Sequence, residues 1–281
     1  MKLINQSAEY LPQQEGFEGI YKQIELAGRT SYLSYDKITD DSAKKFVDMI
    51  IKNKHHSVLE HGTVYLQCRI CLNKKDDTPL SKYKNNKYSK CYEYYFPVNA
   101  SKGTYVTTNL RVLVENNWLD DLQYICNPTE FHEKRLSVKV VTDIGITREF
   151  NCHRNFSITE QPIRYCNFSG DKFGNEITFI KPYWYDSKDS YSNEDISKSD
   201  FDTMVRMAER DYLILVGTLR QPQQARSILP LCTKTEVVYT AFESDWRHFF
   251  DQMLFGKTGE PHPQMKQLAE LIKEQFEKNG L

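Results

Sequence analysis

Two kinds of hydrophobic periodicity follow one another along this chain without regular alternation. Leu136, Val138 and Val140 recur at strand spacing, whereas an apolar stripe at helical spacing runs through residues 243–254. We expect further strands near 63–72, 105–114, 177–180 and 232–240, and helices over 16–27, 41–52, 118–125, 198–220, 223–229 and 262–279. Strict β-α-β alternation is absent, and the pattern therefore predicts an α+β fold.

The chain is long enough to bury one large core. Its 281 residues show no repeat and no internal boundary, so we expect a single domain over residues 1–281. Residues 74–95 are rich in Lys, Asn and Tyr without periodicity, which predicts an excursion from the core at about residues 73–100. Basic residues interleaved with aromatic ones are typical of single-strand nucleic-acid surfaces. Because aspartates dilute the charge and no sheet platform is expected, a solvated loop is favoured, and nucleic acid is not an expected partner.

The charge balance excludes a strong global field. Lys and Arg number 37 against 38 for Asp and Glu, so an anionic ligand must be met by a local cluster. No segment approaches the length of a membrane span, and no apolar run follows the first lysine. We therefore expect a cytoplasmic protein without a membrane partner.

The cysteines predict reduced thiols. Seven of them, an odd number, are scattered through a chain that is too large to need disulfide staples. Cys68 and Cys71 have the spacing of half a zinc site, but no second pair completes it, so no metal is expected.

One short stretch concentrates chemically active side chains. Residues 151–165, NCHRNFSITEQPIRY, fit neither a helical stripe nor a strand alternation and read as a loop. Guanidinium groups are the usual partners of phosphate when the net charge is neutral, and Arg164 and Arg226 each lie where a turn or helix end meets apolar sequence. Each arginine is equally consistent with an ordinary ion pair.

Other features limit the choice of chemistry. The chain has no glycine-rich dinucleotide loop, Walker loop, Gly-x-Ser-x-Gly or His-Glu-x-x-His motif. Cys152 next to His153 does not form a favoured nucleophile–base pair, because adjacent residues on an extended chain point to opposite faces. His248 lies off the apolar stripe of its helix, whereas Met253 lies on it and is interpreted as a core residue.

Taken together, the stretch resembles the signature of flavin-dependent thymidylate synthases, the ThyX family. That signature is Arg-His-Arg followed by Ser-x-x-(Glu/Gln)-x-Ser-x-Arg-Tyr, and it is matched by His153, Arg154, Ser157, Glu160, Arg164 and Tyr165. Residues 57–62 (SVLEHG) and 225–231 (ARSILPL) are similar to two further family segments. SDWRHFFDQM followed by HPQMKQLA resembles the family's C-terminal helix pair.

The resemblance implies an α+β homotetramer, with a mixed sheet flanked by helices and active sites at subunit interfaces. It implies that the flavin is bound by Ser57, Cys152, His153, Arg154, Glu160 and His248. It implies that a pyrimidine nucleotide is bound by Glu149, Gln161, Pro162, Ile163, Arg164 and Arg226, with both arginines on its phosphate. The implied reaction transfers a one-carbon unit from methylenetetrahydrofolate to C5 of dUMP and reduces it with FAD and NADPH.

Three positions depart from the family pattern. Cys152 replaces the first arginine of the signature, and Pro162 replaces a serine and so removes a hydroxyl and a backbone N–H. Met253 takes the catalytic position of an arginine that stabilises the ionised uracil ring in the family. Loss of such a cation lowers turnover by orders of magnitude unless another replaces it, and Lys257 and Arg148 are the candidates.

These departures leave several functions open. The chain is a thymidylate synthase with rearranged cations, a relative that acts at C5 of another pyrimidine nucleotide, or a non-catalytic flavin- or nucleotide-binding homologue. The change from arginine to methionine suits a different ring, because uracil has an acidic N3–H that cytosine lacks.

Overall fold

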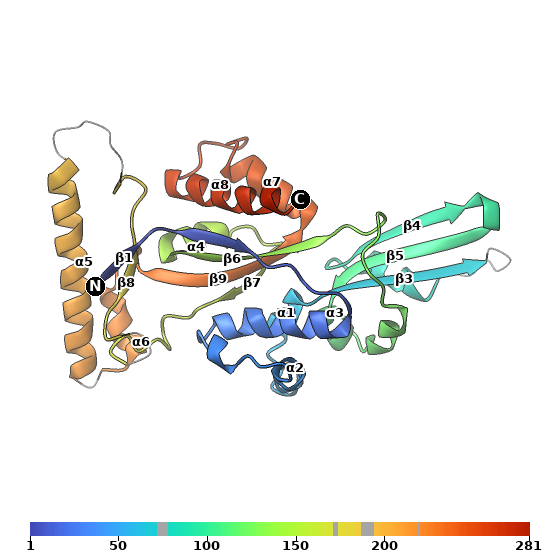
Figure 1. Cartoon of the computed structure of the whole chain (residues 1–281), viewed down its shortest axis with the longest axis horizontal. Coiled ribbons are helices and arrows are strands. Elements are labelled where there is room, and N and C mark those ends of the chain that lie inside the picture. The colour runs from blue at the N-terminus through green and yellow to red at the C-terminus, as the bar shows by residue number, and fades with distance from the viewer. Residues whose placement is uncertain (72–77, 171–173, 187–193, 219) are drawn as a thin grey trace.

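The structure is a computed structural model that describes residues 1–71, 78–170, 174–186, 194–218 and 220–281 (Figure 1). The strands are β1 Lys2–Ile4, β2 Ser7–Tyr10, β3 Thr63–Cys71, β4 Lys90–Phe96, β5 Ser101–Asn109, β6 Arg135–Asp143, β7 Ser157–Glu160, β8 Thr178–Ile180 and β9 Lys234–Phe242. The α-helices are α1 Gly16–Thr30, α2 Ser42–Lys52, α3 Leu110–Glu115, α4 Ile144–Phe150, α5 Glu194–Gly217, α6 Pro222–Ala225, α7 Glu243–Met253 and α8 Pro263–Lys278. The predicted α+β class is confirmed.

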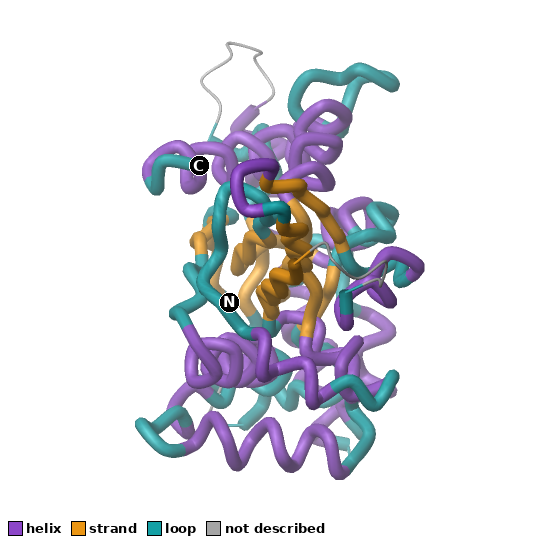
Figure 2. Tube along the Cα trace, turned by 90° about the vertical axis from the view of Figure 1, so that its right-hand side faces the viewer, coloured by secondary structure: helices purple, strands orange, loops and turns teal. Residues whose placement is uncertain are grey.

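A four-stranded sheet forms the centre of the molecule. Its strands lie in the order β2-β6-β9-β7, and every neighbouring pair is antiparallel. Helices α7 and α8 cover one face and α1 covers the other, so the strands lie between helical layers (Figures 1 and 2). Inward residues at strand spacing, among them Val138 and Val140, pack against Trp246 and Phe249 of the α7 stripe. Parallel pairing occurs between β1 and β8.

A second sheet, in the order β3-β5-β4, projects beyond the central sheet and is here called the arm (residues 63–71 and 78–109; Figure 1). Its inner face, with Leu66 and Val106, packs on a separate core that includes Val47 of α2 and Leu113 of α3. The prediction of a loop over residues 74–95 is wrong for residues 90–95, which belong to strand β4, paired with β5 along its whole length. Residues 72–77 lie outside the described part of the chain.

The sequence also missed strand β7. Ser157–Glu160 was expected to be a loop, but it pairs with β9 from Ser157 opposite Thr240 to Glu160 opposite Val237. Ser157 and Thr159 are buried on one face although they are polar, so no hydrophobic alternation marks this strand. The short strands β1 and β2 were not predicted either.

No helix in the described part of the chain is both long enough and apolar enough to cross a bilayer. Cys68 is buried and Cys71 is exposed at the end of β3. Within the described residues, no group of three or more His, Cys, Asp or Glu side chains is arranged to hold a metal ion.

Candidate functional site

The signature stretch folds as a tight turn between α4 and β7. The Asp143 carboxylate caps α4 by accepting a hydrogen bond from the Ile146 amide at 2.8 Å. After α4 ends, the His153 amide donates to the Phe150 carbonyl at 3.0 Å, and the Phe156 amide donates to the His153 carbonyl at 3.2 Å. Phe150 and Phe156 are buried at the two ends of this turn. The turn therefore holds the polar residues between them at the surface of the core.

His153 is half-buried inside this turn. Its ring lies 5.2 Å from the Phe249 ring and 6.4 Å from the His248 ring, measured between centroids. Burial lowers the pKa of His153, and the neighbouring His248 lowers it further. Its Nε2 atom is buried and has no hydrogen-bond partner. A neutral imidazole with an unpartnered nitrogen suits hydrogen bonding to a polar ligand.

Glu160 lies at the end of β7 with its carboxylate fixed. Oε1 accepts hydrogen bonds from the Thr147 hydroxyl at 2.9 Å and from the Thr235 hydroxyl at 3.3 Å. Burial raises the pKa of Glu160, while these hydroxyls, the Asn151 side chain and the charge of Arg148 act in the opposite direction. The carboxylate is thus an immobile acceptor close to the turn.

Gln161 continues from β7 into the next loop and is buried. Its backbone amide donates to the Glu236 carbonyl at 2.8 Å, and its side-chain Nε2 donates to the Cys166 sulfur at 3.1 Å. The side-chain Oε1 is buried and unpartnered. Gln161 is therefore a second residue of the signature with an unused hydrogen-bonding atom, and Pro162 and Ile163 beside it are half-buried.

The two predicted phosphate ligands lie on neighbouring segments. Arg164 is exposed, with its guanidinium 4.6 Å from the Tyr165 ring centre. Two residues later Cys166 enters a small core that also contains Ala225, the residue before Arg226. Arg226 is exposed as well.

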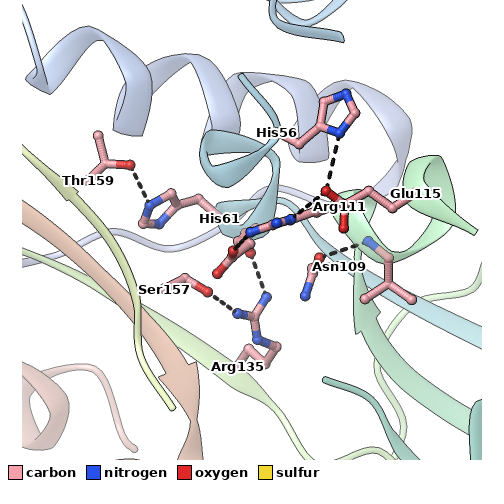
Figure 3. A network of polar contacts seen from close by, with 10 residues as sticks. His56, His61, Asn109, Arg111, Glu115, Arg135, Ser157 and Thr159 are labelled. Atoms are coloured by element: carbon pink, nitrogen blue, oxygen red, sulfur yellow. Dashed lines mark hydrogen bonds and ion pairs between the residues drawn. The ribbon is translucent and has the colours of Figure 1, made fainter. Parts of the chain in front are cut away.

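A short 3₁₀ helix, His56–His61, carries Ser57 and docks against β7. His61 at its end is completely buried, with Nε2 2.9 Å from the Thr159 hydroxyl (Figure 3). Its Nδ1 lies 2.8 Å from the Thr240 hydroxyl. Burial, together with the charge of Arg135, lowers the pKa of His61 to about 3, so its imidazole stays neutral. Ser57 itself is exposed.

Arg135 is a second link between the same elements. One guanidinium nitrogen donates to the Glu60 carbonyl at 2.8 Å and the other donates to the Ser157 hydroxyl at 2.9 Å (Figure 3). Burial lowers the pKa of Arg135 to about 10. The sequence did not identify His61 and Arg135 as residues that support the site. His61 lies within the family-like segment SVLEHG, and Arg135 is the first residue of an alternating strand. These two positions are the features of the sequence from which their supporting role could have been predicted.

Helix α7 brings the last predicted residues to the site. His248 is exposed next to His153, whereas Met253 packs half-buried against the central core. Lys257, a candidate replacement cation, forms an ion pair with Asp251 at 2.7 Å. Arg148, the other candidate, is exposed on α4 and close enough to Glu160 to affect its pKa.

The predicted residues differ in exposure on one chain: Gln161 is buried, and His153 and Glu160 are half-buried. Glu149, Cys152 and Arg154 are exposed around the turn. Cavities of about 220, 450, 270 and 320 Å³ are lined by other residues, at the base of the arm and around α7 and α8. The unpartnered atoms of His153 and Gln161 are compatible with a polar cofactor or substrate at this surface.

Comparison with known proteins gives a family match. A family model described as "Thymidylate synthase complementing protein" matches residues 126–279. Two solved structures of the UMP/dUMP methylase PolB from Streptomyces cacaoi, bound with 5-Br dUMP and 5-Br UMP, are similar at 14% and 13% identity with TM-scores of 0.47 and 0.46. The matches cover 99% of this chain and 93% and 92% of those chains. No curated protein matches this chain.

Proposed function

The chain belongs to the thymidylate synthase complementing protein family, and on this basis we propose that it is a flavin-dependent methyltransferase acting at C5 of a pyrimidine nucleotide. The proposed reaction converts dUMP to dTMP, with methylenetetrahydrofolate as the carbon donor and NADPH as the reductant. The observation that carries the proposal lies in the signature stretch, residues 151–165, where His153 before β7 and Gln161 after β7 each keep a buried hydrogen-bonding atom without a partner.

We propose that FAD is held by Ser57, Cys152, His153, Arg154, Glu160 and His248. When bound, the reduced flavin would supply the hydride for the transferred carbon. The neutral His153 imidazole presents Nε2 as a hydrogen-bonding atom, and the hydroxyls of Thr147 and Thr235 keep the Glu160 carboxylate in place. Arg154 adds a positive charge at the exposed side of the turn, where an anionic cofactor needs one.

The nucleotide would lie against Glu149, Gln161, Pro162, Ile163, Arg164 and Arg226. The free Gln161 Oε1 is an acceptor suited to an N–H of the base, and the two exposed arginines supply charge for the phosphate. Because Glu149, Arg164 and Arg226 are exposed on a single chain, we propose that a second subunit of a homotetramer closes the site.

A second candidate is methylation of another pyrimidine nucleotide. Met253 favours it, because this side chain packs against the core and places no charge beside the ring. Without the arginine that the family has at this position, an ionised uracil ring is less well stabilised. The base is therefore the part of the substrate on which the two candidates differ.

A single-turnover assay separates these proposals. Purified protein is first tested for bound flavin by its absorption spectrum. It is then incubated with methylenetetrahydrofolate, NADPH and either dUMP or dCMP in separate reactions, and the nucleotide product is identified by mass spectrometry. We expect a yellow protein and formation of dTMP. Methylation of dCMP but not dUMP would favour the second candidate. A colourless protein that takes up no added FAD would eliminate both.

A further inference from the structure

Tyr239 lies next to the signature turn, although the signature gives it no role. It belongs to β9, is completely buried, and lies opposite Ile158 of β7, two residues before Glu160. Its ring stacks on the Phe150 ring with 3.7 Å between ring centres. Phe150 in turn stacks on Phe249 at 4.4 Å, so aromatic neighbours hold the tyrosine ring in one orientation.

The hydroxyl of this buried ring reaches Asn151, the residue that follows α4. Tyr239 Oη donates a hydrogen bond to Asn151 Oδ1 at 3.0 Å. Burial raises the pKa of Tyr239 well above its usual value, and the charge of Glu160 raises it further, so the hydroxyl keeps its proton and remains a donor. Asn151 itself is exposed, and this hydrogen bond ties its side chain to the central sheet.

The same hydrogen bond sets which end of the Asn151 amide faces Glu160. A side-chain amide has one accepting oxygen and one donating nitrogen. With Oδ1 turned toward Tyr239, Nδ2 is left for Glu160, and the Asn151 side chain acts on that carboxyl as a hydrogen-bonding group that lowers its pKa. In the reversed orientation the amide oxygen would face the carboxylate, and the contact would be repulsive.

Glu160 needs this donor because its other partners meet one oxygen only. The hydroxyls of Thr147 and Thr235 both donate to Oε1, at 2.9 and 3.3 Å, and the direction of Oε2 depends on further contacts. Burial raises the pKa of Glu160, and a half-buried carboxylate stays ionised when enough donors face it. A third donor in a fixed position therefore helps to keep this group both charged and oriented.

We propose that Tyr239 is a positioning residue for Glu160, because its hydroxyl holds the Asn151 amide so that Nδ2 donates to the Glu160 carboxylate. The inference rests on the proposed function in one respect, namely that Glu160 is a ligand of the flavin. The hydrogen-bonded chain runs from the core, through the first residue of the signature stretch, to the last residue of β7. It couples the orientation of a site residue to a buried side chain outside the signature.

The test measures the pKa of Glu160 by NMR of isotopically labelled glutamate carboxyl carbons, in the full-length protein before flavin is added. The Glu160 resonance is identified by its loss in Glu160→Gln. Tyr239→Phe keeps the ring and its stacking and removes only the hydroxyl. We expect this variant to raise the pKa of Glu160 by about one pH unit, the effect of losing one hydrogen bond to a charged group.

Asn151→Ala is the companion variant, and it changes an exposed side chain, so it leaves no cavity in the core. It should raise the pKa of Glu160 at least as much as Tyr239→Phe does. Because the hydroxyl acts through the amide, the double variant should match Asn151→Ala, whereas independent contributions would add. This comparison separates positioning through Asn151 from a general loosening of the core.

Tyr83 provides a matched control in the core on which the arm packs. It is also completely buried, and its hydroxyl donates to the Asp121 carboxylate at 2.8 Å. Tyr83→Phe removes the same group from a buried tyrosine away from the signature turn. The pKa of Glu160 should therefore be the same in this variant as in the wild type.

An unchanged pKa of Glu160 in Tyr239→Phe would overturn the inference, and so would additive rises in the double variant. FAD is then added to each protein, and its uptake is followed by flavin fluorescence. A raised pKa with roughly tenfold weaker FAD binding by Tyr239→Phe supports both the inference and the proposed function. A raised pKa in a protein that takes up no FAD supports the positioning role and removes the role proposed for Glu160.

Discussion

At the scale of single residues, His61 is a histidine that the fold keeps uncharged. Its pKa falls from 6.5 to about 3 on folding, so between these values the unfolded chain binds a proton that the folded chain does not. The stabilisation by neutral His61 is complete above pH 6.5 and is lost as the pH falls toward 3. The pKa values of His153 and Glu236 are also lowered in the folded protein, so these residues contribute to the loss of stability in acid as well. A variant of His61 is therefore needed to isolate its contribution.

We predict that His61→Gln reduces the loss of stability in acid. Below pH 6.5 the wild type should lose up to about 1.4 kcal/mol per pH unit more than the variant, measured by urea unfolding at pH 7 and pH 5. The exposed His55 provides a matched control, and His55→Gln should follow the wild type. An identical pH dependence in the wild type and His61→Gln would contradict the prediction.

Arg148 is the residue we expect to replace the cation that the family has at the position of Met253. It is exposed beside the signature turn, whereas Lys257 is occupied by Asp251. Preorganised charge is typically worth a factor of about 10²–10³ in turnover. We therefore predict that Arg148→Gln lowers kcat by roughly 10²-fold, measured under single-turnover conditions with saturating nucleotide.

Lys257→Gln is the control for this variant, because it removes an equal charge that is exposed and already paired. Its kcat should stay within about twofold of the wild type, since exposed ion pairs contribute little. The opposite order of effects would identify Lys257 as the replacement cation and would refute the role given to Arg148.

At the scale of elements, Arg135 ties the 3₁₀ helix His56–His61 to strand β7. Its guanidinium contacts both elements while it is buried, and removal of such a group leaves the Glu60 carbonyl and the Ser157 hydroxyl unpartnered. We predict that Arg135→Met lowers the free energy of unfolding by about 2–4 kcal/mol. Amide hydrogen exchange in residues 56–61 should become faster.

Arg111 offers a matched comparison, because it pairs with the Glu60 carboxylate from the other side and is 37% exposed. Arg111→Met should cost less than about 1 kcal/mol, as expected for a partly exposed ion pair. Equal losses in the two variants would mean that burial of Arg135 has no special weight in docking the helix.

The same comparison of elements shows what the sequence could predict. The α7 stripe and the Leu136–Val138–Val140 alternation predicted their elements correctly, because one buried face leaves a period in the hydrophobic residues. Strand β4 was missed although Tyr92, Tyr94 and Phe96 alternate, since tyrosines between lysines resemble a solvated loop. Strand β7 was missed because its buried side chains, Ser157 and Thr159, are polar. They form hydrogen bonds with Arg135 and His61, which lie elsewhere in the sequence.

At the scale of the whole molecule, the site could be predicted only as a set of residues. The signature predicted the turn, and the fold brings His153 next to His248. The family-like segment SVLEHG contains His61 without giving it a role, and Arg135 lies in no family-like segment. The importance of both residues comes from contacts between residues 22 to 179 positions apart in the sequence. The second subunit proposed to close the site at Arg164 and Arg226 would be a matter of assembly, which no local pattern in one chain encodes.

The arm at one end of the molecule has an electrical consequence. Lys82 and Lys90 pair with Asp121 and Glu133, which lie outside the arm, so the cations of the arm are balanced by carboxylates close to them and not across the molecule. Since the chain is also almost neutral overall, the ionic strength of the buffer should have little effect on the rate at which this end meets a charged molecule.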